Sequence, residues 1–507
     1  MHDPIGIDLG LARDGQPQRI LAPMANRHGL IAGATGTGKT VTLQTLAQNF
    51  SRAGVPVFTA DVKGDLAGLA VPGELTPRLA ARVLALKPAG FEPRACPTLF
   101  WDLWGRRGHA VRTTVSDMGP LLLARLLDLN DTQGYVLHLA FKLADDEGLL
   151  LLDLKDLRSL LAWIGNRASE LRTTYGNVSP ATVGSIQRNL LVLDEAGGSR
   201  FFGEPALRIE HLMQRDFSGH GVIGILDAGR LLSDSRLYST FLLWLLAELF
   251  EQLPEVGDQD RPKLVFFFDE AHLLFRDTPR ALVDKIEQVV RLIRSKGVGV
   301  YFVTQNPLDI PTEILAQLGH RVQHALRAFT PADQKVVRAV AETFRQSPGL
   351  DTERTLLELE VGEALVSVLD AKGRPSAVAR TRIYPPESRM GSIEDERRAE
   401  LLGRSPLSGV YDSAVDRESA YEILKQRAEQ AAAPQPAPMP AAPEWAVKTP
   451  PPRRPSAEAK PREAKAAGRR RESVGEAVLK STMRSMGSYV GRQLIRGLMG
   501  SLLGSRR

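Results

Sequence analysis

The chain has 507 residues, of which 43 % are hydrophobic, and its formal net charge is +6. This length predicts two or three domains, and the hydrophobic content is enough for a sizeable core. A single cysteine, Cys96, excludes an intrachain disulfide, and no run reaches the 18 apolar residues expected of a membrane-spanning helix. The first residues lack the basic start and apolar stretch of a signal peptide, so we expect a cytoplasmic protein.

The charge is distributed unevenly along the chain. Residues 448–507 contain 15 Lys or Arg against 4 Asp or Glu, a net charge of +11. The preceding 447 residues contain 50 against 55, a net charge of −5. The high isoelectric point of the chain therefore results from the basic tail. It does not by itself indicate that the body of the chain binds nucleic acid.

The strongest motif follows a short N-terminal segment. Residues 1–32 are expected to hold at most two strands, and their last six residues form an apolar run typical of a buried parallel strand. The run leads into Gly33-Ala-Thr-Gly-Thr-Gly-Lys-Thr40, which matches the phosphate-binding pattern G-x-x-x-x-G-K-[ST]. Glycines let the backbone curl around a phosphate, Lys39 adds a cation, and the Thr40 hydroxyl can ligate Mg²⁺. Apolar residues at helical spacing follow, and a helix N-terminus facing an anion is the context that this motif needs.

A second strand is expected at residues 55–60, and Asp61 follows it directly. An acidic residue just past a strand end lies at the edge where parallel sheets bind ligands. Asp61 is therefore a candidate site residue, with a solvated turn at Lys63-Gly64-Asp65 as the alternative interpretation.

The pattern then becomes mainly helical as far as residue 215. A strand or strand edge is expected at 98–104, and helical spacing recurs over 121–129, 134–143, 149–164 and 180–193. This segment is predicted to be a helical insertion. Its candidates for contact with a polymer held in a channel are Arg158, Arg167 and Arg172.

The sheet is expected to resume at 221–226, and an apolar helix is expected at 237–253. Residues 263–268 then form an apolar run that ends in Asp269 and Glu270, the second signature of a nucleotide hydrolase. We expect Asp269 to hold Mg²⁺ and Glu270 to polarise the attacking water as a general base.

A helix over residues 279–295 precedes a buried strand at 297–303, whose polar tip includes Gln305. A polar side chain there can contact the γ-phosphate or the attacking water. Residues 362–369 and 377–383 predict a terminal strand pair. Four arginines are candidates for a finger that enters a neighbouring subunit's site, namely Arg291, Arg294, Arg321 and Arg327.

The C-terminal part has a different composition. A charged extension after residue 386 contains a candidate helix at 419–432. Residues 431–472 are rich in Pro, Ala, Lys and Arg and are expected to be disordered. Residues 473–507 regain apolar spacing flanked by basic side chains, which predicts an amphipathic segment for an anionic membrane or a protein partner.

Two rival nucleotide-binding families are disfavoured. The chain contains neither the Leu-Ser-Gly-Gly signature of transporter ATPases nor the Asn-Lys-x-Asp motif of GTPases, which favours ATP over GTP.

Residues 26–40, the segment Asp269-Glu270-Ala-His272 and residues 294–305 together resemble the HerA–FtsK superfamily of ring-forming ATPases. Residues 55–66 look like the bacterial YjgR-like branch of that superfamily. The resemblance implies an α/β fold with a RecA-like P-loop ATPase core, a mainly parallel sheet, and ATP and Mg²⁺ as cofactors. It also implies a homo-oligomer, most simply a hexameric ring with its sites between subunits.

The resemblance also implies roles for individual residues. Thr40 and Asp269 would hold Mg²⁺, Glu270 would be the base and Gln305 a sensor. Arg294 would be the finger in trans, with Arg321 as the second choice. The residues that would bind the nucleotide are Gly33, Ala34, Thr35, Gly36, Thr37, Gly38, Lys39, Thr40 and Val41.

The predicted core is split in two by the insertion. Residues 1–77 and 216–385 would form the ATPase core, residues 78–215 the insertion and residues 386–430 a helical extension. Relatives that pump DNA carry a β-barrel or membrane domain before the phosphate loop, whereas 32 residues precede it here.

Double-stranded DNA is the expected partner by superfamily analogy, which predicts a helicase or translocase. The alternative is an ATPase that remodels or docks a protein or membrane partner through the C-terminal tail. That alternative predicts a cytoplasmic protein that associates peripherally with a membrane.

Overall fold

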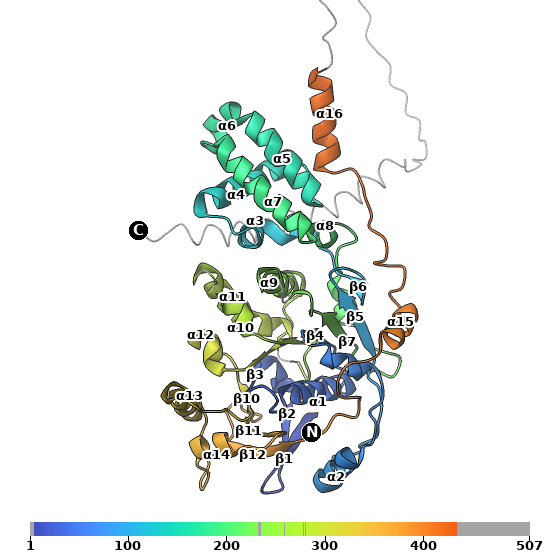
Figure 1. Cartoon of the computed structure of the whole chain (residues 1–507), viewed down its shortest axis with the longest axis vertical. Helices are drawn as coiled ribbons and strands as arrows, with labels where there is room; N and C mark the ends of the chain where they lie inside the picture. Colours follow the sequence, from blue (N-terminus) through green and yellow to red (C-terminus); the bar gives the residue numbers. More distant parts are fainter. Residues whose placement is uncertain (1–4, 232–234, 258, 277, 279, 433–507) are drawn as a thin grey trace, which may run out of the picture. The chain divides into compact units, whose positions relative to one another are not determined.

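One sheet of twelve strands organises the residues that the computed structural model describes, which are 5–231, 235–257, 259–276, 278 and 280–432 (Figure 1). The strands are β1 (Gly6–Ala12), β2 (Pro17–Leu21), β3 (Gly29–Ala32), β4 (Val57–Asp61), β5 (Thr98–Asp102), β6 (His109–Ala110), β7 (Ile223–Asp227), β8 (Leu264–Phe268), β9 (Val298–Thr304), β10 (His320–Gln323), β11 (Glu363–Ser367) and β12 (Ala379–Ile383). Their order in the sheet is β2-β1-β12-β11-β10-β3-β9-β8-β4-β7-β5-β6.

Most of this sheet is parallel, which confirms the predicted fold class. The seven neighbouring pairs from β10 to β6 are parallel, and the four pairs from β2 to β10 are antiparallel. Because parallel strands end at the same edge, the segments that follow β3, β9, β8 and β4 meet there. β9 lies between β3 and β8, and β4 flanks β8 on its other side.

Side chains of the central strands alternate between two hydrophobic cores, one on each face of the sheet. In β8, Val265 and Phe267 enter the core that contains α1 (Lys39–Arg52), whereas Phe266 and Phe268 enter the core that contains α9 (Ser235–Gln252) and α11 (Arg280–Ile293). Complete burial of each of these phenylalanines contributes about 1.5–3 kcal/mol. A strand covered on both faces is apolar at every position, as the sequence of β8 is.

In the sequence, six α-helices of the described part come between β6 and β7. In space they gather on one side of the sheet (Figure 1). They are α3 (Val115–Leu126), α4 (Asp131–Asp146), α5 (Leu154–Asn166), α6 (Ala168–Tyr175), α7 (Pro180–Glu195) and α8 (Gly198–Phe201). The helix predicted over 149–164 starts later than expected, because the Asp153 side chain caps α5 by accepting hydrogen bonds from Lys155 N and Asp156 N. The strand expected at 98–104 is β5, which pairs with β7 and so belongs to the main sheet.

The remaining helices surround the sheet or follow it. The α-helices are α2 (Pro77–Leu86), α10 (His272–Phe275), α12 (Thr312–Leu315), α13 (Pro331–Glu342), α14 (Thr352–Glu358), α15 (Asp395–Gly403) and α16 (Ala420–Ala432). The 3₁₀ helices are η1 (Ala22–Arg27), η2 (Asp65–Ala70), η3 (Ile209–Leu212), η5 (Arg294–Lys296) and η6 (Pro307–Asp309).

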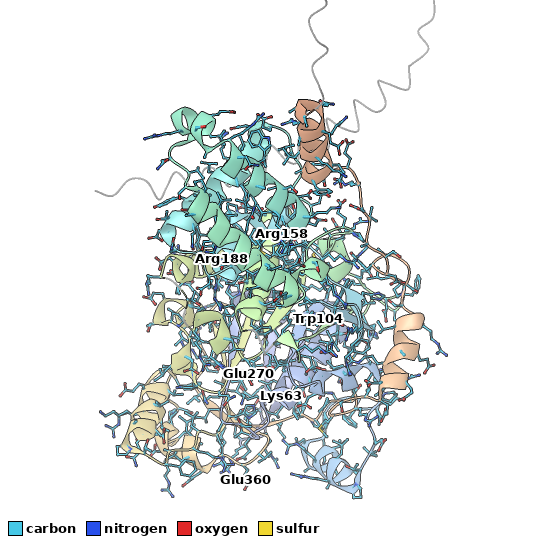
Figure 2. The ribbon with its side chains drawn as sticks, turned by 45° about the horizontal axis from the view of Figure 1, so that its top comes forward. Lys63, Trp104, Arg158, Arg188, Glu270 and Glu360 are labelled. Atoms are coloured by element: carbon cyan, nitrogen blue, oxygen red, sulfur yellow. The ribbon has the colours of Figure 1, made fainter. Side chains whose placement is uncertain are left out.

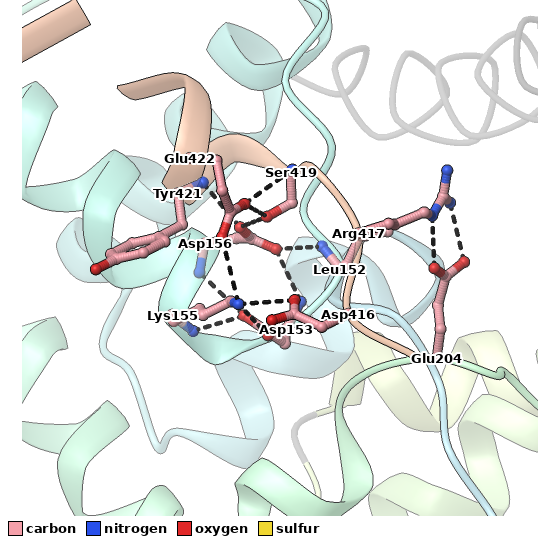
Figure 3. A network of polar contacts seen from close by, with 10 residues as sticks. All are labelled: Leu152, Asp153, Lys155, Asp156, Glu204, Asp416, Arg417, Ser419, Tyr421 and Glu422. Carbon is pink, nitrogen blue, oxygen red and sulfur yellow. Dashed lines mark hydrogen bonds and ion pairs between the residues drawn. The ribbon is translucent and has the colours of Figure 1, made fainter. Parts of the chain in front are cut away.

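Residues 384–432, which we call the C-terminal strap, connect the sheet with the helical insertion. The Arg398 guanidinium lies 4.5 Å above the centre of the Phe100 ring, and the ring of the buried Tyr411 packs edge-on against Trp101. At the far end of the strap the Asp156 carboxylate of α5 accepts hydrogen bonds from Ser419 and from Tyr421 N (Figure 3). Contacts with β5 and with α5 therefore hold the strap against both parts of the body.

Two ion pairs also join the strap to the rest of the body. Arg417 pairs with Glu204 at 2.6 and 2.9 Å, and Lys155 pairs with Asp416 at 2.8 Å (Figure 3). The helix predicted at 419–432 is α16, which begins one residue after Ser419.

The first 32 residues hold three strands, where the sequence predicted at most two. β1 and β2 form an antiparallel hairpin, and β1 also pairs with β12. The linker predicted at 431–472 lies outside the described residues except for its first two, which end α16, and the segment predicted at 473–507 lies wholly outside them. No helix among the described residues is long and apolar enough to cross a membrane.

Candidate active site

The phosphate loop joins β3 to α1 at the carboxyl edge of the parallel strands. Gly33, Gly36 and Gly38 have φ angles of 149°, 78° and 117°, a region that suits glycine. A Cβ atom on Gly33 would lie 2.5 Å from the Cβ atom of His324, so that position also needs glycine for lack of space. A Cβ atom on Gly36 would meet nothing within 4 Å. The loop is thus packed on one side and open on the other, above the N-terminus of α1.

Lys39 and Thr37 stabilise the loop from within. Lys39 Nζ donates hydrogen bonds to Gly33 O at 2.6 Å and Ala34 O at 3.1 Å, and Thr37 Oγ1 donates to Ala34 O at 2.7 Å. Burial lowers the pKa of Lys39, while the charges of Glu270 and Asp269 raise it. The ammonium group therefore lies among the loop carbonyls and near both acidic side chains.

Asp269 and Glu270 directly follow β8. Tyr238 of α9 donates its hydroxyl hydrogen to Asp269 O at 2.7 Å, and Glu270 N donates to Asp269 Oδ1 at 2.9 Å. Glu270 has a φ of 47°, a backbone conformation that is uncommon for residues other than glycine. Burial and the charge of Glu270 raise the pKa of Asp269 to about 7. Such a carboxylate is stabilised by a cation beside it.

Gln305 connects the acidic pair with the phosphate loop. Its Nε2 lies 3.4 Å from Glu270 Oε2 and 3.5 Å from Glu270 Oε1, and its Oε1 accepts a hydrogen bond from Thr35 Oγ1 at 3.3 Å. This bridge follows from the strand order. β9, which precedes Gln305, lies between β3, which leads into the phosphate loop, and β8, which leads into Asp269 and Glu270. The structure therefore brings Thr35, Lys39, Glu270 and Gln305 together.

Arg294 lies elsewhere in the same chain. It belongs to η5, which precedes β9, and its carbonyl oxygen accepts a hydrogen bond from Asn26 Nδ2 at 3.3 Å. β9 is parallel to β3 and spans about 20 Å, so Arg294 lies at the edge of the sheet opposite the phosphate loop. Arg321 of β10 donates to Leu315 O and Thr343 O. The structure does not bring Arg294 to the nucleotide site of its own chain.

Sequence reasoning gave no role to three residues that the structure places at the site. Lys63 Nζ lies 3.5 Å from Glu270 Oε1, and His272 Nδ1 lies 3.4 Å from Glu270 Oε2. Figure 2 shows Lys63 close to Glu270. His324 packs behind the loop, with Nε2 2.8 Å from Thr42 Oγ1 and Nδ1 2.8 Å from the carbonyl oxygen of Glu363. The one feature of the sequence that could have indicated a role for Lys63 was its position just after the end of a buried strand.

Asp61 is buried at the end of β4, which differs from the solvated turn of the alternative interpretation. Its carboxylate accepts hydrogen bonds from Gly64 N at 2.8 Å and Leu66 N at 3.0 Å and thereby shapes the turn after β4. Burial raises the pKa of Asp61 to about 6. This carboxylate organises the loop that carries Lys63.

The donor groups fit a nucleotide phosphate and its magnesium ion. The loop supplies backbone N–H groups at a helix N-terminus, which suit an anion. The Thr40 hydroxyl and the Asp269 carboxylate are hard oxygen ligands of the kind that Mg²⁺ binds. Among the described residues, no group of three or more His, Cys, Asp or Glu side chains could hold a metal ion by itself.

A family model for the helicase HerA-like C-terminal domain matches residues 8–507. The chain belongs to this family. No curated protein sequence matches the chain significantly. As a member of the helicase HerA-like C-terminal family with a phosphate loop next to an Asp-Glu strand end, the protein is a P-loop ATPase of the HerA–FtsK type.

The solved structure of a plasmid coupling protein shares the fold of this family member. The plasmid coupling protein TrwB in complex with ADP and Mg²⁺ is similar with a TM-score of 0.50 and 15 % identity over 76 % of this chain and 89 % of that chain. VirB4 of Thermoanaerobacter pseudethanolicus is similar with a TM-score of 0.48 and 16 % identity over 76 % of this chain and 97 % of that chain. At these identities the TrwB comparison shows only a common RecA-like fold.

Proposed function

We propose that the protein is an ATP-driven motor that acts on double-stranded DNA as a homo-oligomeric, hexameric ring. The observation that carries the proposal is the match of nearly the whole chain to a family described as helicase HerA-like. The solved structure of TrwB, which is described as a plasmid coupling protein in complex with ADP and Mg²⁺, agrees in fold. We place the protein in the cytoplasm.

The proposed chemistry is hydrolysis of the γ-phosphate of ATP. Lys39 and the loop N–H groups bind the phosphates, and Thr40 and Asp269 hold Mg²⁺. When bound, Mg²⁺ neutralises charge that develops on the phosphate oxygens. Glu270 accepts a proton from the attacking water, and Gln305 links Glu270 to the loop through Thr35.

The position of Arg294 supports a shared site. An arginine that lies at the opposite edge of its own sheet cannot serve the phosphate loop of its own chain. In a head-to-tail ring each subunit presents one face to the site of the next, and a finger in trans accelerates hydrolysis by about 10³–10⁵. Arg294 is therefore our proposed finger, with Arg321 as the second candidate.

One observation favours the alternative of a protein partner. Two arginines that the sequence offered as polymer contacts are paired within the insertion, Arg158 with Asp194 at 3.1 Å and Arg167 with Glu170 at 3.7 Å. A shallow groove on α5 and α7 is lined by Arg158, Ser159, Ala162, Gln187 and Leu191 (Figure 2 labels Arg158 and Arg188 there). Leu191 is half-exposed, at 51 %. The one cation that lines this groove, Arg158, is thus paired with a carboxylate of the same insertion.

The test is the steady-state ATPase rate of the full chain without polymer, with single-stranded DNA and with double-stranded DNA, at two salt concentrations. A second protein that ends at residue 432 separates the body from the tail. Stimulation by double-stranded DNA that survives this truncation and weakens with salt is the expected result. Basal hydrolysis with no response to either DNA would favour the protein-directed alternative.

A further inference from the structure

Lys63 and Gln305 flank Glu270 from two neighbouring strands. β9 delivers Gln305 on one side of β8, and β4 delivers Lys63 on the other side. Gln305 Nε2 lies 3.4 Å from Glu270 Oε2, and Lys63 Nζ lies 3.5 Å from Glu270 Oε1. Each carboxylate oxygen of Glu270 therefore has at least one donor nearby, from a different strand end.

The backbone that carries Lys63 is itself fixed. Gly64 has a φ of 78°, and the buried Asp61 carboxylate accepts the backbone hydrogens of Gly64 and Leu66. η2 starts at Asp65, so the turn between β4 and η2 is only three residues long. A short turn with two capping hydrogen bonds restricts where the Lys63 side chain can go. The backbone of Lys63 is thus held in a fixed position near the end of β8.

We propose that Lys63 is a positioning residue that holds the carboxylate of Glu270 in the orientation that serves hydrolysis. The inference rests on the proposed role of Glu270 as the general base. The Glu270 side chain is 10 % exposed and that of Lys63 is 46 % exposed, so the ammonium covers the carboxylate from the solvent side. Oε2 already lies 3.4 Å from His272 Nδ1, so without the lysine Oε1 would keep only Gln305 Nε2, 3.5 Å away, and the carboxylate would be held less firmly. A base that points away from the γ-phosphate loses proximity and orientation, while ATP binding is unaffected.

The primary experiment compares Lys63→Met, Lys63→Arg and the wild-type chain in steady-state ATP hydrolysis. Lys63→Met keeps the length of the side chain and removes the charge, and it should lower kcat about tenfold with KM changed less than about twofold. Lys63→Arg restores a cation of similar reach and should recover kcat to within about threefold. Lys372→Ala, in an exposed turn after β11, is the matched surface control and should behave as the wild type.

A second measurement shows whether Lys63 acts through Glu270. In single turnovers the Lys63→Met change should slow the wild-type chain but have little further effect in a Glu270→Gln background. An equal slowing in both backgrounds, or an unchanged or increased kcat in Lys63→Met, would overturn the proposal. The role of Glu270 is tested separately: a Glu270→Gln chain that hydrolyses ATP at the wild-type rate would refute the base assignment itself. A thermal melt of each variant identifies loss of folding, and Lys63→Gln, which also removes the charge, replaces Lys63→Met with the same expected fall in kcat if that variant does not fold.

Discussion

Two adjacent acids at the end of a buried strand give this site its electrostatic character. The pKa of Asp269 rises to about 7 because burial and the charge of Glu270 both disfavour its ionised form. Lys39 is close enough for its charge to be felt by both acids. A site with two acidic side chains and one lysine favours an additional cation. Binding of a magnesium–nucleotide complex requires this property.

Replacement of Lys39 by alanine should abolish nucleotide binding under ordinary assay conditions. The ammonium group makes charge-assisted hydrogen bonds that contribute about 1.5–3 kcal/mol each, so the Kd for ATP should rise at least about 100-fold. Titration calorimetry with a slowly hydrolysed ATP analogue measures this change. Lys372→Ala should bind the analogue as the wild type does, and wild-type affinity in Lys39→Ala would contradict the assignment.

Replacement of Glu270 by glutamine should separate binding from turnover. An amide of nearly the same shape keeps the contact with Gln305 but cannot accept the proton of the attacking water, so kcat should fall about 10²–10⁴-fold. The affinity for ATP should stay within a small factor of the wild-type value. Parallel measurement of single-turnover hydrolysis and of ATP binding checks both expectations.

At the scale of elements, buried caps fix the junction between the strap and the insertion. Asp156 is fully buried, and its Oδ2 accepts hydrogen bonds from Leu152 N at 2.8 Å and Asp153 N at 3.1 Å. Its other oxygen accepts from Ser419 Oγ and from Tyr421 N (Figure 3). One carboxylate therefore caps the start of α5 and the start of α16 at the same time.

Replacement of Asp156 by alanine should weaken this junction. Three backbone N–H groups, those of Leu152, Asp153 and Tyr421, would lose their acceptor, while the Ser419 hydroxyl would keep Glu422. The free energy of unfolding should therefore fall by about 2–4 kcal/mol. Chemical denaturation monitored by tryptophan fluorescence, to which Trp163 in α5 contributes, checks this value. Asp416→Ala, whose 77 % exposed side chain pairs with Lys155, is the control and should change stability by less than about 1 kcal/mol. Equal losses in both variants would show that burial of the cap has no special effect.

At the scale of the whole molecule, the sheet separates the phosphate loop from Arg294, and three buried histidines lie in or next to its strands β3 and β10. His28, His320 and His324 are buried, and burial is the largest cause that lowers the pKa of each of them to about 4. His320 Nε2 donates its hydrogen to Met24 O at 2.9 Å, and its ring stacks on Tyr301. The folded chain thus holds these rings in their neutral form.

Mixing two inactive variants should restore hydrolysis if Arg294 works in trans. An Arg294→Ala subunit keeps a complete Glu270, and a Glu270→Gln subunit keeps the arginine, so some interfaces of a mixed ring combine both intact groups. The ATPase rate of co-assembled subunits should exceed the sum of the separate rates. A strictly additive rate would contradict the shared site, and Arg321→Ala in the same assay tests the second candidate.

Acid should destabilise the fold through the buried histidines. Their folded pKa of about 4 lies below the value of 6.5 for an unfolded histidine, so the unfolded chain binds more protons between these values. Their contribution to stability is complete above pH 6.5 and is lost as the pH falls toward 4, with a slope of up to about 4 kcal/mol per pH unit for three groups. Asp61 and Asp269, whose folded pKa values are raised to about 6 and about 7, oppose it with about 1.4 kcal/mol per pH unit each, so the net slope between pH 4 and 6 should be smaller. Unfolding measured as a function of pH checks this. His320→Gln should lower the contribution of the histidines to the slope by about 1.4 kcal/mol per pH unit, the value for one proton.

The sequence by itself determined the fold class and the parts of the site that are local in the chain. The phosphate loop, the buried strand ending in Asp269 and Glu270, and the polar tip at Gln305 are each encoded within about ten residues, because glycine placement, apolar runs and helical spacing act over that distance. The sequence also predicted an α/β protein, since strands and helices alternate around these motifs.

Only the tertiary structure decided which strand ends are neighbours. β4 and β8 pair although about 200 residues separate them, and this pairing places Lys63 beside Glu270. The same sheet places Arg294 far from its own phosphate loop, and the strap reaches α5 through Asp156. Strand order depends on how two hydrophobic cores close around the sheet, which is a property of the whole chain and is absent from any single segment.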